Sequence, residues 1–155
     1  MSEEPSITVL TQTRDILAAK LPCYDITFGE NLKFIGRSEI LKTIDKALLG
    51  PRLPSDKKHR AFAISGRGGV GKTQTALHFA YQHKHKKTFR SILWASAESR
   101  HKLLQGFAAY ALLLGIIPKP VESKPTDIGE DAQELIKWYE RTGVYTLLEC
   151  ASGQH

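Results

Sequence analysis

The sequence has few cysteines and no long apolar run. Its two cysteines, Cys23 and Cys150, stand far apart without CxxC spacing, so neither a disulfide framework nor a zinc site is expected. The longest apolar candidate, Leu103 to Ile117, is interrupted by Gln105 and two glycines. A membrane-spanning helix needs about 20 predominantly apolar residues, so we expect no membrane partner.

The first residues also lack the features of a secretory signal. They read Met-Ser-Glu-Glu-Pro, which is acidic, and no positively charged flank or apolar stretch follows. We therefore expect a cytoplasmic protein. The chain has neither an internal repeat nor a low-complexity segment, which argues against repeat and fibrous architectures.

The length and overall composition are those of one ordinary globular domain. The chain has 155 residues, of which 41% are hydrophobic and 25% charged, with a formal net charge of +6. A positive charge can indicate an acidic partner such as nucleic acid. The basic residues gather in two groups: Lys57, Lys58 and Arg60, then Lys84, Lys86, Lys87 and Arg90. Both groups are predicted at the end of a strand–helix–strand unit opposite a glycine loop, so we expect solvated charge and not a nucleic-acid site.

The N-terminal third predicts a lead-in and one amphipathic helix. Residues 1–30 hold a short helix candidate, Thr11 to Leu21, and are interpreted as a lead-in or linker. A helix is then predicted with Ser38 as N-cap and Gly50 as terminator. Its apolar residues recur at intervals of three and four, which places them on one face: Ile40, Leu41, Ile44 and Leu48.

Strand and helix patterns then alternate along the rest of the chain. Short apolar runs predict buried strands at Ala61 to Ser65, Ser91 to Ala97 and Val144 to Leu148. Apolar residues with helical spacing predict helices around Leu77 to Tyr81, Leu103 to Leu112 and Ala132 to Tyr139. Trp94 and Trp138 occur in these patterns as core residues. The order predicts an α/β fold with a parallel sheet.

A glycine-rich loop between the first strand and its helix carries the clearest chemical signal. It matches glycine, four residues, glycine, lysine and threonine in every fixed position: Gly66, Arg67, Gly68, Gly69, Val70, Gly71, Lys72 and Thr73. Because its glycines carry no side chains that would obstruct the approach, the loop's backbone N–H groups can converge on phosphate oxygens at the helix N-terminus. The lysine adds a full charge, and the threonine hydroxyl can coordinate Mg²⁺. A dinucleotide-binding loop does not require this lysine and threonine. We therefore predict a P-loop for the phosphates of a purine nucleoside triphosphate or diphosphate, with Gln74 following it.

Three segments together resemble the NB-ARC family of STAND signalling ATPases, which includes fungal NLR-like receptors. Phe34, Ile35, Gly36 and Arg37, with Glu39, are similar to the opening motif, which touches the adenine in that family. The P-loop and the residues after it match the family's usual wording, and Phe89 to Ala97 resembles the next block. The resemblance runs from about residue 24 to residue 142.

The resemblance implies a three-layer P-loop core with helices on both faces of the sheet. Family members have five parallel strands in the order 5-1-4-3-2, hold Mg²⁺, and self-associate through this domain. Residues 31–155 would form part of such a domain. The absent fourth strand would lie between the strand Ala61 to Ser65 and the third strand. Ala61 to Ser65 would then either keep an unpaired edge or pair directly with the third strand, which the family topology does not do. We accordingly expect an incomplete sheet of marginal stability.

The chain departs from the family where a strand should end in the Walker B aspartate. The corresponding run is Tyr145 to Cys150, and the sequence ends at His155. Glu149 is close to the expected acidic position, but its neighbours differ; it is interpreted as a plain terminal charge, with a Mg²⁺ ligand as the alternative. The chain is expected to be a fragment of a longer protein, with negligible ATP turnover.

Three functions follow from these patterns. The first is an ADP- or ATP-binding module of a signalling switch. The second is a P-loop enzyme of another class, such as a kinase or a GTPase, although no acceptor or base-recognition motif is visible. The third is a non-catalytic decoy or interaction fragment, which the missing Walker B acid favours. Nucleotide titration discriminates among them.

Overall fold

The computed structural model describes residues 14–54, 59–122, 124, 126–144 and 146–151. They divide into two compact units. One, called here the sheet unit, combines the residues up to Thr27 with those from His83 onward. The other, called the loop unit, is Phe28–Gln82. Each unit is described by itself.

The sheet unit contains a parallel sheet of three strands. These are β1 (Cys23–Asp25), β2 (Ser91–Ser96) and β3 (Thr146–Ala151), in the order β1-β2-β3. In register, Ser91 of β2 lies between Cys23 of β1 and Thr146 of β3. The expected α/β class and parallel pairing are confirmed, and β2 lies beside β3 as the resemblance implies.

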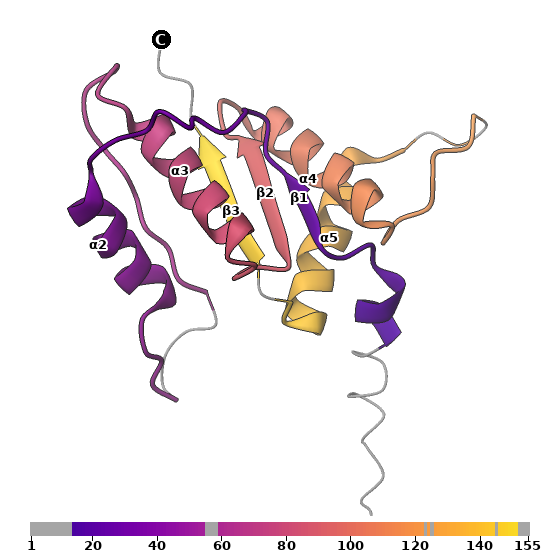
Figure 1. Ribbon diagram of the computed structural model, residues 1–155. Helices are drawn as coiled ribbons and strands as arrows, with labels where there is room; N and C mark the ends of the chain where they lie inside the picture. The colour runs from indigo at the N-terminus through magenta and orange to yellow at the C-terminus, as the bar shows by residue number, and fades with distance from the viewer. Residues whose placement is uncertain (1–13, 55–58, 123, 125, 145, 152–155) are drawn as a thin grey trace, which may run out of the picture. The chain divides into compact units, whose positions relative to one another are not determined.

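Two helices, α4 (Arg100–Leu114) and α5 (Ile128–Thr142), pack against each other on one face of this sheet (Figure 1). Their apolar residues meet inward-facing residues of β1 and β2 in one buried cluster. Its members are Cys23, Leu93, Ala95, Tyr110, Ala111, Leu114, Leu135 and Trp138. Trp138 is 2% exposed and Trp94 of β2 is 7% exposed, which confirms both tryptophans as core residues.

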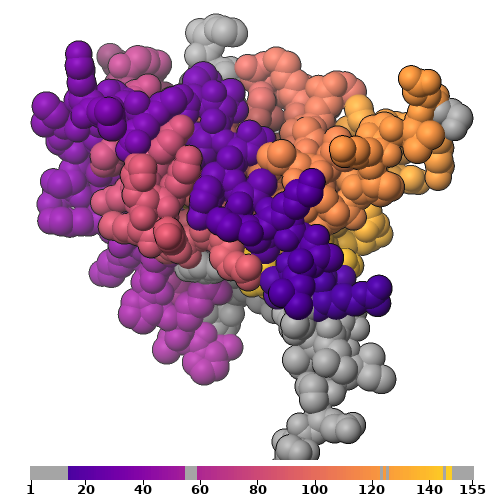
Figure 2. Space-filling view, turned by 45° about the vertical axis from the view of Figure 1, so that its right-hand side comes forward, coloured from indigo at the N-terminus to yellow at the C-terminus, as the bar shows by residue number. Residues whose placement is uncertain are grey.

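Local sequence signals set the ends of these helices. The Ser99 side chain accepts a hydrogen bond from the Lys102 N–H at the start of α4, and Gly115 ends that helix at φ 76°. The Asp127 carboxylate accepts from the N–H groups of Gly129 (2.8 Å) and Glu130 (3.2 Å) at the start of α5. Such N-caps satisfy donors that have no partner within the helix. The loop joining α4 to α5, coloured orange in Figure 1 and Figure 2, projects from this unit.

A buried polar cluster ties α4 and α5 to the strands. The Tyr110 hydroxyl donates to the Cys23 carbonyl at 2.7 Å and lies 2.7 Å from the Ser91 hydroxyl. The Tyr139 hydroxyl lies 3.1 Å from the same Ser91 oxygen. Burial raises the pKa of Tyr139 to about 12 and also raises the pKa of Tyr110. The cluster satisfies polar atoms that would otherwise be costly to bury.

The loop unit contains α2 (Ser38–Leu49) and most of α3 (Lys72–His85), which continues into the sheet unit. Ile44 is the buried residue of α2, and Gly50 ends the helix as expected. The prediction that Ser38 caps α2 is wrong: Ser38 is the first helical residue, and Arg37 occupies the cap position at φ 57° without a side-chain cap hydrogen bond.

The strand predicted at Ala61 to Ser65 is not formed. The run has no regular secondary structure and no strand partner in the described part of the chain, and its residues are exposed or half-buried. A strand is stable only when a neighbour takes up its backbone hydrogen bonds. Within the described residues the run therefore provides no strand edge. The three-layer P-loop core remains a prediction.

Other elements differ from expectation in smaller ways. The third strand covers Thr146–Ala151 instead of Val144 to Leu148. Strand β1 lies in the predicted lead-in and was not expected, while the described part of the first helix candidate is helical at residues 14–18. None of the helices within the described ranges has the length and apolar character to traverse a bilayer.

Candidate phosphate-binding site

The glycine loop leads directly into α3, whose first residue is Lys72. Gly69 and Gly71 have φ values of 77° and 88°, a region that glycine enters at little cost. A Cβ added at Gly68 or Gly69 would meet nothing within 4 Å. The loop therefore presents open backbone at the N-terminus of a helix, as expected for a loop that receives phosphate.

Lys72 places its ammonium group inside this loop. Its Nζ donates to the carbonyl of Gly66 at 2.6 Å and to that of Arg67 at 2.8 Å. The loop thus closes around a full positive charge that is held by two neutral acceptors. Both acceptors are neutral backbone oxygens. A phosphate oxygen that approached the ammonium would add the attraction of opposite charges and make the stronger contact.

The first turn of α3 continues the site. Thr73, the predicted Mg²⁺ ligand, is exposed as the second residue of the helix. Thr75 closes the turn, because its N–H and its hydroxyl both donate to the Gly71 carbonyl at 2.9 Å. The chain thus offers a complete loop as a binding site for phosphate, and one hydroxyl, that of Thr73, as a ligand for Mg²⁺.

Residues 28–37, called here the arm, lie along α3 and the glycine loop within the same unit. The Tyr81 hydroxyl donates to the Phe28 carbonyl at 2.7 Å, and the Asn31 side-chain amide donates to Gln74 Oε1 at 3.2 Å. The Phe34 ring stacks on the His78 ring with centroids 4.2 Å apart and planes 13° apart. The structure therefore brings Phe34, one of the predicted adenine-side residues, to the helix that carries Lys72.

Arg37 forms the last contact of the arm. Its guanidinium donates to the Val70 carbonyl, and a Cβ added at Gly71 would lie 3.2 Å from Arg37 Nη2. Arg37 therefore supports the loop from one side, and Gly71 leaves room for it. Ile35, between Phe34 and Gly36, is 91% exposed.

Sequence reasoning missed Asn31 and His78. Neither residue belongs to a motif, and His78 stands at a polar position inside a helical pattern, so only the fold reveals their contacts. Gln74, predicted to be near phosphate, directs its side-chain oxygen to Asn31.

Glu149 lies in β3, in register with Trp94, and thus in the sheet unit. Its side chain is outside the described set, so its role as a Mg²⁺ ligand stays a prediction. Within the described ranges, no group of three or more histidine, cysteine, aspartate or glutamate side chains is arranged to hold a metal.

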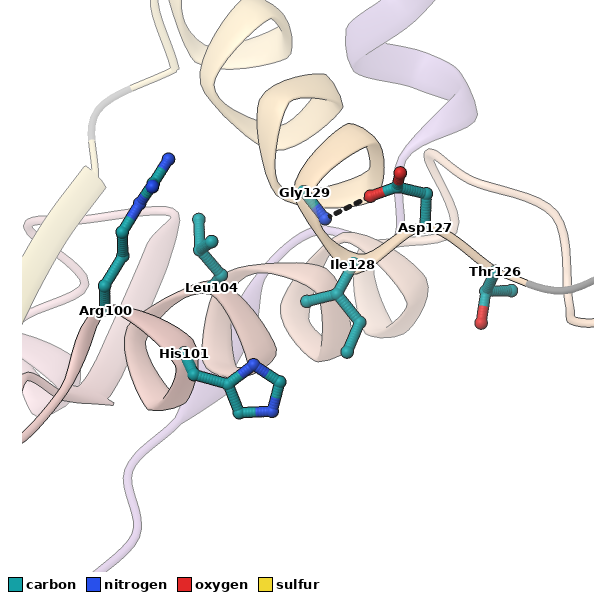
Figure 3. Close-up of a pocket in the computed structure, with 7 residues that line it drawn as sticks. All are labelled: Arg100, His101, Leu104, Thr126, Asp127, Ile128 and Gly129. Carbon is teal, nitrogen blue, oxygen red and sulfur yellow. Dashed lines mark hydrogen bonds between the residues drawn. The ribbon is translucent and has the colours of Figure 1, made fainter.

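A second candidate is an open cavity of about 730 Å³ in the sheet unit, between the first turns of α4 and α5. Its lining consists of Arg100, His101, Leu104, Thr126, Asp127, Ile128 and Gly129. Figure 3 shows that Arg100 and His101 point in different directions, and that Asp127 is hydrogen-bonded to Gly129. Polar groups that do not converge, together with a carboxylate used as a cap, make this the weaker site.

Comparison with known proteins gives one relationship. The chain is 38% identical over 84 residues to a "Nucleotide-binding leucine-rich repeat (NLR)-like protein" of Hyaloscypha variabilis. The matched region covers 54% of this chain but only 8% of that relative. No family model matches the chain, and no solved structure matches it. The chain is thus related to an NLR-like protein over about half of its length.

Proposed function

We propose that this chain binds the phosphate groups of ADP or ATP at Gly66 to Thr73, and that it is the nucleotide-binding part of a signalling switch of the NB-ARC type. The observation that carries the proposal is the glycine loop closed around the Lys72 ammonium at the start of α3. The name of the fungal relative, which describes a nucleotide-binding protein, supports it.

The residues would divide the work of binding by their chemistry. Backbone N–H groups of Gly68 to Gly71 would donate to phosphate oxygens, and Lys72 would leave the Gly66 and Arg67 carbonyls to pair with the phosphate charge. Mg²⁺, when bound, would neutralise phosphate charge, and the Thr73 hydroxyl would be its protein ligand. The arm, with Phe34 to Arg37, would lie at the adenine.

Calorimetric titration with ADP, ATP and GTP in the presence of Mg²⁺ tests the proposal. We expect ADP and ATP to bind and GTP to bind more weakly. Lys72→Ala should weaken ADP binding at least tenfold, since a hydrogen bond to a charged group contributes about 1.5 to 3 kcal/mol. The measurement is the dissociation constant of each variant.

Lys137→Ala is the matched control for this titration. Lys137 is an exposed lysine on α5 that pairs with Glu134 at 3.5 Å, an ion pair of little energetic weight. Its removal subtracts one positive charge without touching the loop, so ADP binding should stay unchanged. Equal affinities for wild type and Lys72→Ala would show that Lys72 is not part of the site.

The further features implied by the resemblance remain predictions. They include self-association through this domain and a cytoplasmic location. Preferential binding of GTP would instead favour another class of P-loop protein.

A further inference from the structure

We propose that His78 is a positioning residue for the nucleotide base: its ring holds Phe34, and Phe34 fixes the arm at the place where the base binds. This inference rests on the proposed function, because it concerns the base end of the same site. The motif residues Phe34 to Arg37 do not include His78, and the glycine loop ends before it.

The ring geometry is the first support. Phe34 and His78 lie nearly parallel, with centroids 4.2 Å apart and an interplanar angle of 13°. Both side chains are half-buried. An aromatic pair of this kind stabilises its arrangement beyond the contribution of the buried area alone, so the stack can hold a segment that has no regular secondary structure.

The position of the stack along α3 is the second support. His78 follows Lys72 by six residues, which corresponds to roughly 9 Å along a helix that rises 1.5 Å per residue. One helix therefore carries the phosphate-binding lysine and, further along, the contact that holds the base-side segment. The stack fixes the separation between the two ends of the nucleotide site.

The other contacts of the arm lie on either side of Phe34. One of them, from the Tyr81 hydroxyl to the Phe28 carbonyl, ties the start of the arm to α3 at 2.7 Å. The Asn31 amide and the Arg37 guanidinium hold the arm to Gln74 and Val70, which lie in or beside the glycine loop. Between them, Leu32 and Ile35 are 87% and 91% exposed. The apolar side chains at the centre of the arm thus have two different environments. Phe34 packs on α3, whereas Leu32 and Ile35 are exposed, where a base can contact them.

The same geometry predicts how the loss of His78 would act. Without the imidazole ring, Phe34 has no flat partner on α3. The arm keeps its contacts at Phe28, Asn31 and Arg37, and the segment around Phe34 loses its own contact with the helix. The phosphate contacts would persist, because Lys72 and the loop amides do not depend on His78. Only ligands that carry a base should lose affinity.

Titration of His78→Ala and His78→Phe with ADP and with inorganic pyrophosphate tests this inference. We expect His78→Ala to weaken ADP binding by about 2- to 10-fold, the range of a lost aromatic pair, and to leave pyrophosphate binding unchanged. His78→Phe retains a flat ring and should bind ADP within about twofold of wild type. His85→Ala, which removes a histidine from the last turn of the same helix, is the control and should bind both ligands normally.

A double-mutant cycle with Phe34→Ala separates positioning from direct contact. If His78 acts through Phe34, His78→Ala in a Phe34→Ala background should cost no further ADP affinity. Additive losses, unchanged ADP affinity in His78→Ala, or equal losses for ADP and pyrophosphate would overturn the inference while the proposed function stood. If neither ADP nor pyrophosphate bound to the wild type, the proposed function itself would be refuted.

Discussion

Tyr110 and Tyr139 show at the scale of single residues how the sheet unit couples burial to protonation. Both hydroxyls lie within hydrogen-bonding distance of the Ser91 hydroxyl oxygen. Burial raises the pKa of each tyrosine above the ordinary value of 10. Above pH 10 the unfolded tyrosines release protons that the folded ones retain. The unfolded state then binds fewer protons, so the free energy of unfolding falls as pH rises.

We therefore predict a loss of stability between pH 10 and pH 12 that Tyr139→Phe reduces. Below pH 10 the same tyrosines are protonated in both states and contribute no pH dependence. Burial also raises the pKa of the Cys23 thiol, which acts in the same direction, so the comparison is between wild type and Tyr139→Phe. Urea unfolding followed by circular dichroism at several pH values measures it. Parallel pH profiles for the two proteins would contradict the assignment.

Elements that the sequence predicted correctly are those whose signals are local. α4 and α5 have helical apolar periodicity, and Gly115 and Gly143 end them in left-handed conformations. β2 is an apolar run, and its residues Ser91 to Ala95 are all buried, as is usual in a parallel sheet. Each of these signals can be identified without knowing what the element packs against.

Elements that depend on distant partners were missed or misassigned. β1 has three residues, too few for a periodic pattern, and exists because it pairs with β2. Ala61 to Ser65 has the apolar character of a buried strand, yet no described strand pairs with it. The candidate site divides in the same way: the glycine loop was visible in the sequence, whereas the Phe34–His78 stack required the fold.

The capping of α5 gives a prediction at the element scale. Asp127→Ala removes the acceptor for the Gly129 and Glu130 N–H groups and should destabilise the sheet unit by about 0.5 to 2 kcal/mol. Asp127→Asn keeps a capping oxygen and should lose much less. Urea unfolding monitored by tryptophan fluorescence reports the change directly, because Trp138 lies in α5 and Trp94 in β2. Identical midpoints for Asp127→Ala and wild type would show that the cap contributes nothing.

At the scale of the whole molecule, the two units carry different properties. The sheet unit holds the large buried cluster, both tryptophans and the tyrosine network. The loop unit holds the glycine loop, Lys72 and the arm, and Ala61 to Ser65 has no strand partner among the described residues. The proposed ligand site therefore belongs to the loop unit, and we expect most of the apolar stabilisation in the sheet unit.

The central claim, that nucleotide phosphates bind at the glycine loop, is tested most directly by mapping backbone amide chemical shifts during titration with ADP and Mg²⁺. The account predicts saturable shifts concentrated at Gly66 to Thr73, with smaller shifts in residues 28–37, and their loss in Lys72→Ala. Inorganic pyrophosphate should reproduce the loop shifts. Shifts gathered instead around Arg100 and Asp127, at the cavity between α4 and α5, or an unperturbed glycine loop at saturating ADP, would contradict the account.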